Sequence, residues 1–170
     1  MESMFERCES LSLIDVSNWN TSKVTNMSWM FGYYDYGNET MPLSSIDVSN
    51  WDTSSVTNMS GMFCHCRHLS SLDLSNFDTS NVTDMSFMIR GCESLTSIDV
   101  SNWDTSNVTK MKELFYDCES LISLDASNWN TSKVTDMKTM FFNCNKLTFL
   151  NISNWDLKYH DFSKVLNFLQ

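Results

Sequence analysis

One nine-residue phrase recurs along this chain at a fixed spacing, and the repeat constrains the fold more than any other feature. The phrase is SNWDTSNVT at 101–109, and near copies of it begin at residues 17, 49, 75 and 127. Its Ser-Asn-aromatic start recurs at 153, so the starts are separated by one interval of 32 residues and four of 26. A catalytic motif is needed once, whereas a constant period is typical of stacked structural repeats.

Each 26-residue unit predicts a short strand followed by a short helix. Apolar Ile98 and Val100 alternate with polar residues in 95–102, which is the period of a strand with one buried face. Thr109 is then a suitable N-cap for a helix. The residues after the strand show the spacing of one helix face, with apolar side chains at Val108, Met111, Leu114 and Phe115. Single units cannot bury these faces alone, but stacked units can.

We therefore predict an α/β fold, a right-handed solenoid with one parallel sheet of about six strands and a short helix in each coil. The chain forms one domain, 1–170, in which 1–8 is a partial first repeat and 9–157 holds stacked repeats with an insertion near 32–42. Residues 158–170 form a C-terminal capping helix, because helical spacing relates Phe162, Val165, Leu166 and Leu169. Since the chain begins inside a repeat, it is either a piece of a longer protein or capped by its own first helix.

The skeleton LxxLDLSN followed by WDTSNVTxMxxMFxxC resembles a known family. It is similar to the 26-residue leucine-rich repeat of BspA-like bacterial surface proteins, especially the branch found in mycoplasma-type lipoproteins. The resemblance covers residues 1 to about 157. It implies a leucine-rich-repeat-like arc, no catalytic activity and a role in adhesion or host-protein binding. It also implies a location at the bacterial cell surface, or secretion, as part of a longer protein.

Composition limits the partners and the turn chemistry. The formal net charge of −10 disfavours binding to nucleic acid or to an anionic membrane. No apolar run is long enough to insert into a bilayer, and no signal sequence is visible in MESMFERCES, which leaves a cytoplasmic location as the alternative. With four Gly and one Pro, the turns must use hydrogen bonds from Asp, Asn, Ser and Thr side chains.

Several residue types recur at one phase of the repeat and are predicted to form rows through the stack. A buried row of thiols is expected at Cys8, Cys66, Cys92, Cys118 and Cys144. An aromatic spine is expected at Trp19, Trp51, Phe77, Trp103, Trp129 and Trp155, beside a ladder of Asn side chains that bond the backbone.

The segment CHCRH, 64–68, places two Cys and two His within five residues, which suggests a metal site. The spacing is tighter than that of a zinc loop, and Cys66 already belongs to the thiol row. We therefore predict no metal site and no cofactor. The chain has three His and no nucleophile motif or phosphate-binding Gly loop, so we predict that it is not an enzyme.

Two regions are candidates for binding a protein partner. An exposed acidic stripe, which suits a basic partner, is predicted at Asp47, Asp73, Asp99 and Asp125, although flanking Ser hydroxyls and solvent could equally offset its charge. The insertion carries Tyr33, Tyr34 and Tyr36 as aromatic anchors, with a plain surface bulge as the alternative. Trp29 and Phe87 share a variable phase and are predicted to be exposed contacts.

The sequence thus predicts a non-catalytic protein-binding repeat module. The alternative is an intracellular or phage-encoded acidic inhibitor that mimics nucleic acid and occupies a basic protein groove.

Overall fold

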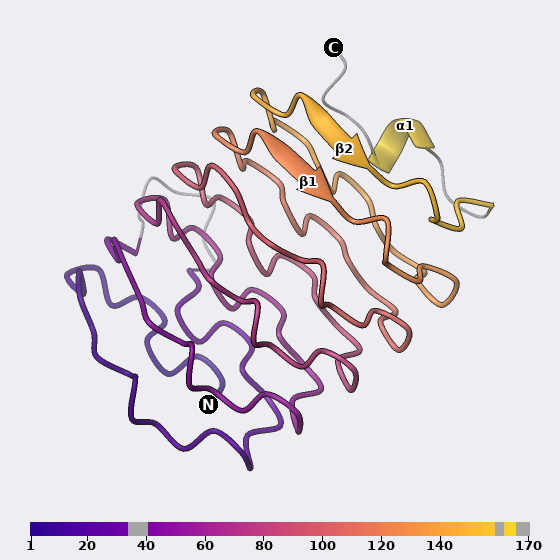
Figure 1. The fold of residues 1–170 in the computed structure, drawn as a ribbon. Coiled ribbons are helices and arrows are strands. Elements are labelled where there is room, and N and C mark those ends of the chain that lie inside the picture. The colour runs from indigo at the N-terminus through magenta and orange to yellow at the C-terminus, as the bar shows by residue number, and fades with distance from the viewer. Residues whose placement is uncertain (34–40, 159–161, 166–170) are drawn as a thin grey trace.

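A computed structural model describes residues 1–33, 41–158 and 162–165 of the chain. Its regular elements are two strands, β1 (Ser123–Asp125) and β2 (Phe149–Asn151), and one helix, α1 (Phe162–Val165). The strands are parallel neighbours in which Leu124 pairs with Leu150 (Figure 1).

The predicted fold class is wrong. The described residues contain two short strands where about six were expected, and no helix follows the repeated phrase in any coil. They therefore do not form the α/β, leucine-rich-repeat-like solenoid that the sequence suggested. Thr109 is not a helix cap, because its N–H and its hydroxyl both donate to the carbonyl of Thr83, at 2.9 and 3.1 Å.

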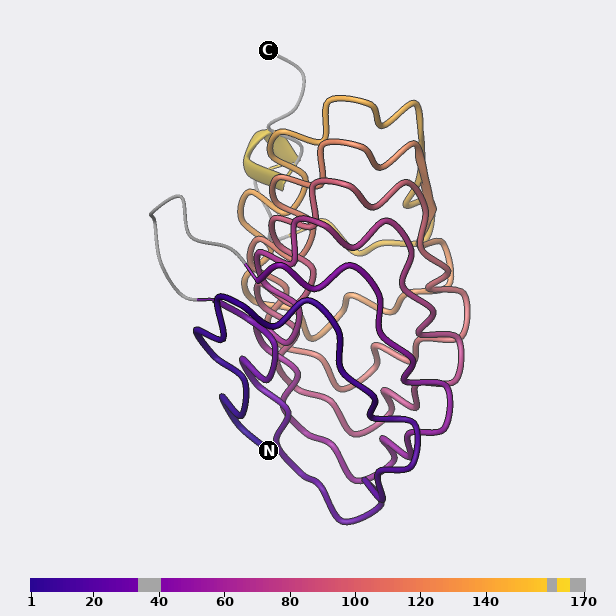
Figure 2. The ribbon, with the colours of Figure 1, turned by 90° about the vertical axis from the view of Figure 1, so that its left-hand side faces the viewer.

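The chain instead winds through irregular coils that lie one on another, and each coil is one repeat unit, of 26 residues except in the longer unit that holds the insertion (Figures 1 and 2). Isolated parallel bridges join equivalent residues of successive coils along one line through Asn26, Asn58, Asp84, Lys110 and Asp136. Each coil has a strand segment, such as 96–101, and a turn segment, such as 111–118. In Figure 2 the strand segments lie on the right and the turn segments, with α1, on the left.

The turn segment is not a helix because half of its N–H groups bond outside their own coil. Alternate N–H groups donate to carbonyls of the next coil at 2.8–3.0 Å. The donating N–H groups are those of Met111, Glu113, Phe115 and Asp117. The intervening N–H groups, such as that of Leu114, donate three residues back. Glu113 and Asp117 have φ of 56° and 57°, and a left-handed residue at every fourth position is incompatible with a right-handed helix.

The strands are short because Asp side chains take over the backbone N–H groups that would extend them. The N–H of Ser127, two residues beyond the end of β1, donates to Oδ1 of Asp125 at 3.0 Å. Asn151 does the same for Ser153 at the end of β2. Such Asx turns bend the chain out of the strand without glycine or proline.

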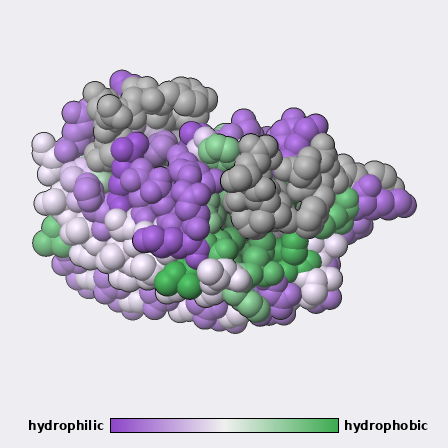
Figure 3. Space-filling model, turned by 90° about the horizontal axis from the view of Figure 1, so that it is seen from above, coloured by the Kyte–Doolittle hydropathy of each residue, from purple (hydrophilic) through white to green (hydrophobic). Residues whose placement is uncertain are grey.

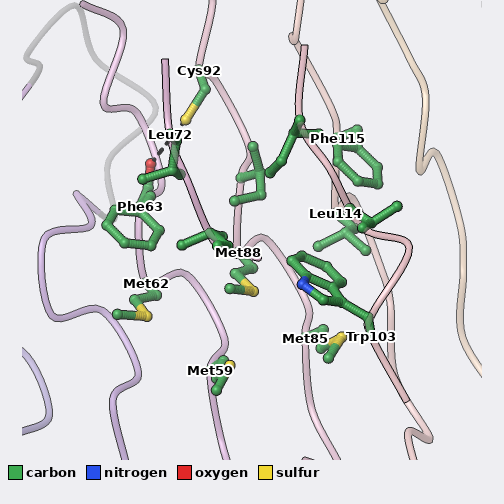
Figure 4. Close-up of a cluster of buried hydrophobic side chains, with 14 of the residues drawn as sticks. Met59, Met62, Phe63, Leu72, Met85, Met88, Cys92, Trp103, Leu114 and Phe115 are labelled. Carbon is green, nitrogen blue, oxygen red and sulfur yellow. Dashed lines mark hydrogen bonds between the residues drawn. The ribbon is translucent and has the colours of Figure 1, made fainter. Parts of the chain in front are cut away.

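Apolar side chains from both segments fill the space between them and form rows along the stack (Figure 4). The indoles of Trp103 and Trp129 stack at 5.8 Å, and those of Trp129 and Trp155 at 5.7 Å. The predicted aromatic spine is therefore confirmed. Nε1 of Trp129 and of Trp155 donates to a carbonyl of the preceding coil, whereas Nε1 of Trp103 has no partner among the described residues.

The predicted Asn ladder is also confirmed, and so is the buried thiol row from Cys66 onward, whereas Cys8 is only half-buried. Cys92 donates to the carbonyl of Phe63 at 3.3 Å, and Cys66, Cys118 and Cys144 make equivalent bonds (Figure 4). From Asn50 onward, each ladder Asn donates from Nδ2 to a Ser carbonyl of the preceding coil, as Asn102 does to Ser75 at 3.3 Å and Asn154 to Ser127 at 2.9 Å.

The two ends of the stack differ. At the N-terminal end, the N–H groups of Ser3 and Phe5 donate to the following coil at 2.9 Å. At the other end, α1 supplies the carbonyls of Lys164 and Val165 to N–H groups of the last turn segment. The helix α1 occupies part of the segment 158–170, for which a capping helix was predicted, and 159–161 and 166–170 lie outside the described residues. The predicted domain division stays a prediction.

Bonds between coils are expected to differ in strength with burial. Thr79 is 1% exposed and donates from Oγ1 to the carbonyl of Asp104, while exposed Thr83 donates to that of Thr57. Thr79→Val should lower the free energy of unfolding by about 1–3 kcal/mol, because the hydrogen bond of a buried hydroxyl is lost. Thr83→Val should change it by less than about 0.5 kcal/mol, because water replaces the hydroxyl. Urea denaturation measures both, and equal effects would contradict this assignment.

Candidate functional site

Aromatic side chains and one arginine form a continuous row across the turn segments, where the repeats differ. We call this the aromatic–arginine row; it consists of Trp29, Phe87, Arg90, Tyr116 and Phe142. The rings of Trp29 and Phe87 lie 5.9 Å apart, and those of Tyr116 and Phe142 stack at 4.9 Å. The Arg90 guanidinium connects the two pairs, 6.0 Å from the Phe87 ring and 4.5 Å from the Tyr116 ring.

The row is partly open to solvent. Phe142 is 37% exposed, and Trp29, Phe87 and Tyr116 are half-buried. In the view from above, hydrophobic residues gather in one area beside a broad hydrophilic one (Figure 3). Aromatic and arginine side chains that are only half covered are the usual anchors of protein interfaces.

Gly61 allows Trp29 to reach Phe87 across the intervening coil. Gly61 occupies the same phase as these two residues, has φ of 63°, and lies directly under the indole. A Cβ added there would lie 2.5 Å from ring atoms of Trp29. The ring–ring contact therefore depends on the absence of a side chain at this one position.

An ion pair holds the middle of the row. Nη1 of Arg90 bonds Oε2 of Glu113, and the two side chains are 14% and 12% exposed. Nζ of Lys112 lies 3.3 Å from Oε1 of Glu113 and 5.3 Å from the Phe87 ring centroid. These contacts orient the guanidinium against the rings, and burial of Tyr116 raises the pKa of its hydroxyl.

Sequence reasoning identified Trp29 and Phe87 but missed Arg90, Tyr116 and Phe142. These three residues occupy another phase of the repeat, and Cys64 occupies it in the coil before Arg90. The type of side chain at this phase therefore varies between coils. That variation beside constant apolar positions was a usable signal. Contact of these three side chains with one another and with Phe87 could not be predicted from the sequence, because it depends on the left-handed turns.

Of the three tyrosines in the insertion, the structure describes only Tyr33. Tyr33 is 3% exposed, and the Arg7 guanidinium lies 5.6 Å from its ring. Its side chain is therefore inside the molecule. Tyr34 and Tyr36 lie outside the described residues.

The acidic stripe lies on the strand segments, on the other side of the stack from the aromatic–arginine row (Figure 2). Its members Asp47, Asp73, Asp99 and Asp125 are all exposed. In each, Oδ1 accepts the N–H of the Ser two residues later at 2.9–3.0 Å. Hydrogen bonds from that Ser lower the pKa of all four carboxyls, so the stripe stays ionised at neutral pH.

A shallow groove of about 340 Å³ runs along this stripe. We call it the strand-side groove. Three successive coils line it, with Ser45, Ile46, Ser71, Leu72, Asp73, Ser97, Ile98 and Asp99. Its exposed groups are hydroxyls and carboxylates, because Leu72 and Ile98 are buried and belong to the core.

The residues of CHCRH lie in separate environments. Cys66 belongs to the thiol row, and burial raises the pKa of the Cys64 thiol to about 12. His68 is exposed, whereas the His65 ring packs against Gly91, where a Cβ would lie 2.4 Å from Nδ1. Among the described residues, no group of His, Cys, Asp and Glu is arranged to bind a metal ion.

Comparison with known proteins gives the family of this chain. The family model described as "Mycoplasma protein of unknown function, DUF285" matches residues 1–99 and 36–155. The chain belongs to this family. The match supports the mycoplasma-type affiliation that the repeat suggested, but not the leucine-rich-repeat assignment. No curated protein and no solved structure was found to be similar to the chain. None of the described helical residues forms a segment long and apolar enough to cross a membrane.

The contact between Trp29 and Gly61 predicts a specific coupling. Gly61→Ala should lower the free energy of unfolding by about 1–3 kcal/mol, because the new methyl group overlaps the indole. In a Trp29→Ala background the same change should lower it by less than about 1 kcal/mol, since other side chains adopt positive φ at this phase. Chemical denaturation of the four proteins measures the difference, and purely additive effects would refute the contact.

The lowered pKa of His65 predicts that the protein loses stability at mildly acidic pH. Burial, followed by the charges of Arg90 and Arg67, lowers its pKa from 6.5 to about 4. The unfolded chain therefore takes up a proton at higher pH, and stability present above pH 6.5 is lost as the pH falls towards about 4. The raised pKa values of Glu93 and Asp117 act in the opposite sense.

The test compares variants between pH 7 and pH 4.5. His65→Gln should flatten the decline of the unfolding free energy relative to wild type. His68→Gln, which removes an exposed imidazole, serves as the control and should leave the decline unchanged. An unchanged slope in His65→Gln would show that His65 does not carry the effect.

Proposed function

We propose that this chain is a non-catalytic protein-binding repeat module that binds its partner through the aromatic–arginine row. One observation carries the proposal: partly exposed Trp, Phe, Tyr and Arg side chains form a continuous surface where the repeats differ. Such side chains contribute most of the binding energy in protein interfaces.

The constant residues of the repeat support this choice of surface. The Asn ladder, the Asx turns and the buried Thr hydroxyls all bond to backbone groups of the chain itself. These polar side chains therefore already have hydrogen-bond partners within the stack. Positions that vary between coils, such as those of Phe87 and Phe142, are not part of this repeated bonding pattern, so their side chains can serve recognition.

We further infer a role at the surface of a mycoplasma-type bacterium, in adhesion or binding of host proteins. The family match supports the bacterial group, and the resemblance of the repeat to surface proteins supports the setting. The partner is a protein rather than a nucleic acid, because a net charge of −10 opposes binding to a polyanion.

The test uses the immobilised chain and an extract of animal-cell surface proteins. Proteins retained by the wild type are identified, and the affinity of the main one is measured by biolayer interferometry. Trp29→Ser with Phe142→Ser should weaken binding at least about tenfold, because both changes remove aromatic anchors.

The matched control is Met4→Ser with Ile122→Ser, which removes two side chains that are 47% and 50% exposed but lie outside the row. It should change the affinity less than about twofold. Equal losses in both double variants, or no retained protein, would refute the proposal. Circular dichroism establishes that each variant is folded as the wild type is.

A further inference from the structure

The first coil of the stack leaves one face of the core partly uncovered. Met4 is 47% exposed, whereas Met30 and Met62, which occupy the same phase in the next two coils, are 0% exposed. Other core rows show the same contrast between their first member and the next one. This surface lies at the opposite end of the stack from α1 (Figure 1). We call it the N-terminal end face; it consists of Met1, Met4, Phe5, Cys8, Trp19 and Val24.

The aromatic rings on this face lack the second neighbour that inner rings have. Phe31, one coil further in, is stacked between Phe5 at 5.3 Å and Phe63 at 5.7 Å. Among the described residues, Phe5 stacks only on Phe31 and meets Trp19 at a tilt of 33°. The end face therefore offers ring surface on which a further apolar or aromatic side chain can pack.

Backbone acceptors on the same face are also without partners. In an inner turn segment, alternate carbonyls accept N–H groups of the coil before, as the carbonyl of Met62 accepts that of Phe31 at 3.0 Å. In the first coil, the carbonyls at these phases accept no backbone N–H group from any described residue. They form a line at every second residue, in Glu2, Met4 and Glu6. Such an open edge is a template for pairing with another chain.

The face carries unpaired donors as well. In the second coil, Nε1 of Trp51 donates to the carbonyl of Val16 at 3.1 Å, and the N–H of Thr57 donates to the carbonyl of Thr25 at 2.8 Å. At the same phases of the first coil, Nε1 of Trp19 and the N–H of Thr25 have no acceptor within the described part of the chain. Because acceptors and donors occupy different parts of one face, that face is complementary to itself.

The other end of the stack does not offer a matching surface. There α1 covers the turn side, where the carbonyl of Lys164 accepts the N–H of Thr139 at 2.6 Å. Met140 and Phe141, in the last turn segment, are 0% exposed. A head-to-tail continuation of the stack is therefore obstructed by α1, whereas the end face of a second copy is open.

We propose that two copies of this chain associate through their N-terminal end faces as a two-fold symmetric dimer. A rotation that places the turn segment of each copy against residues 18–25 of the other brings the unpaired carbonyls towards the unpaired donors in both halves. The contact also covers Met4, Phe5 and Trp19, so the apolar rows of the stack continue across the interface. The end face shares no residue with the aromatic–arginine row, so either proposal can fail without the other.

Sedimentation of the 170-residue chain over a range of protein concentrations tests the proposal. The buffer holds about 0.15 M salt, which screens the repulsion between two chains of net charge −10. The chain should show a monomer–dimer equilibrium without larger species. Met4→Asp should raise the dissociation constant of the dimer at least about tenfold, because it places a charge in the apolar part of the contact.

The matched control is Ile122→Asp, which adds the same charge at a side chain of similar exposure. Ile122 is 50% exposed and lies directly before β1, in an inner coil. This variant should change the dissociation constant less than about twofold. Circular dichroism establishes that both variants are folded as the wild type is.

Cys8 reports where the contact lies without any substitution. It is half-buried on the end face, whereas the five other cysteines are buried. Alkylation of Cys8 by iodoacetamide should become slower as the protein concentration rises, because the dimer covers this side chain. In Met4→Asp the rate should not change over the same range.

Four outcomes would overturn the proposal. A monomer at every concentration would show that the end face binds no second copy and is left to a partner of another kind. A dimer in which Cys8 reacts as fast as in the monomer would place the contact on another surface. Species larger than a dimer would indicate head-to-tail association. Equal weakening by Met4→Asp and Ile122→Asp would show that added charge, and not this face, decides association.

Discussion

Hydrogen bonds between successive coils are the constraint on which this structure depends. In every turn segment, alternate N–H groups donate to carbonyls about one repeat further along the chain, as Phe115 does to Met140 at 3.0 Å. On other parts of the coil the direction reverses, and Thr135 donates to Thr109 at 2.8 Å. These bonds require equivalent residues to lie opposite one another, which explains the constant 26-residue spacing. A coil that shifted by one residue would leave its backbone groups unpaired and move its apolar side chains out of the core.

Side chains rather than regular secondary structure satisfy the remaining backbone groups. Most coils make Asx turns at three places, exemplified by Asp73, Asp78 and Asp84 in one repeat, whereas Lys110 occupies the third place in the next repeat. Asn ladders and buried Thr hydroxyls then connect each coil to its neighbour. This division of roles explains why four Gly suffice in a structure built almost wholly of turns. It also separates the scaffold, whose polar groups are committed to the backbone, from the positions that vary between coils.

The two candidate binding surfaces differ in how far the sequence could reveal them. The Asp residues of the stripe were identified with their exposure, because strand alternation places every second residue outside. The groove beside them was not foreseen, because three coils must lie side by side to form it. The aromatic–arginine row was identified only in part. Its members lie on different coils, and Gly61 decides whether Trp29 can cross from one coil to the next.

The sequence by itself determined the period, the phase of each row and the side chains that face the core. These follow from spacing alone, because residues one period apart must meet in any stack. The tertiary structure decided the backbone conformation. The pattern Val108, Met111, Leu114 fits a helix as well as it fits successive turns, and only pairing with the neighbouring coils distinguishes the two. That pairing draws half of the N–H groups out of the segment and makes left-handed residues of Glu113 and Asp117, so a helix cannot form.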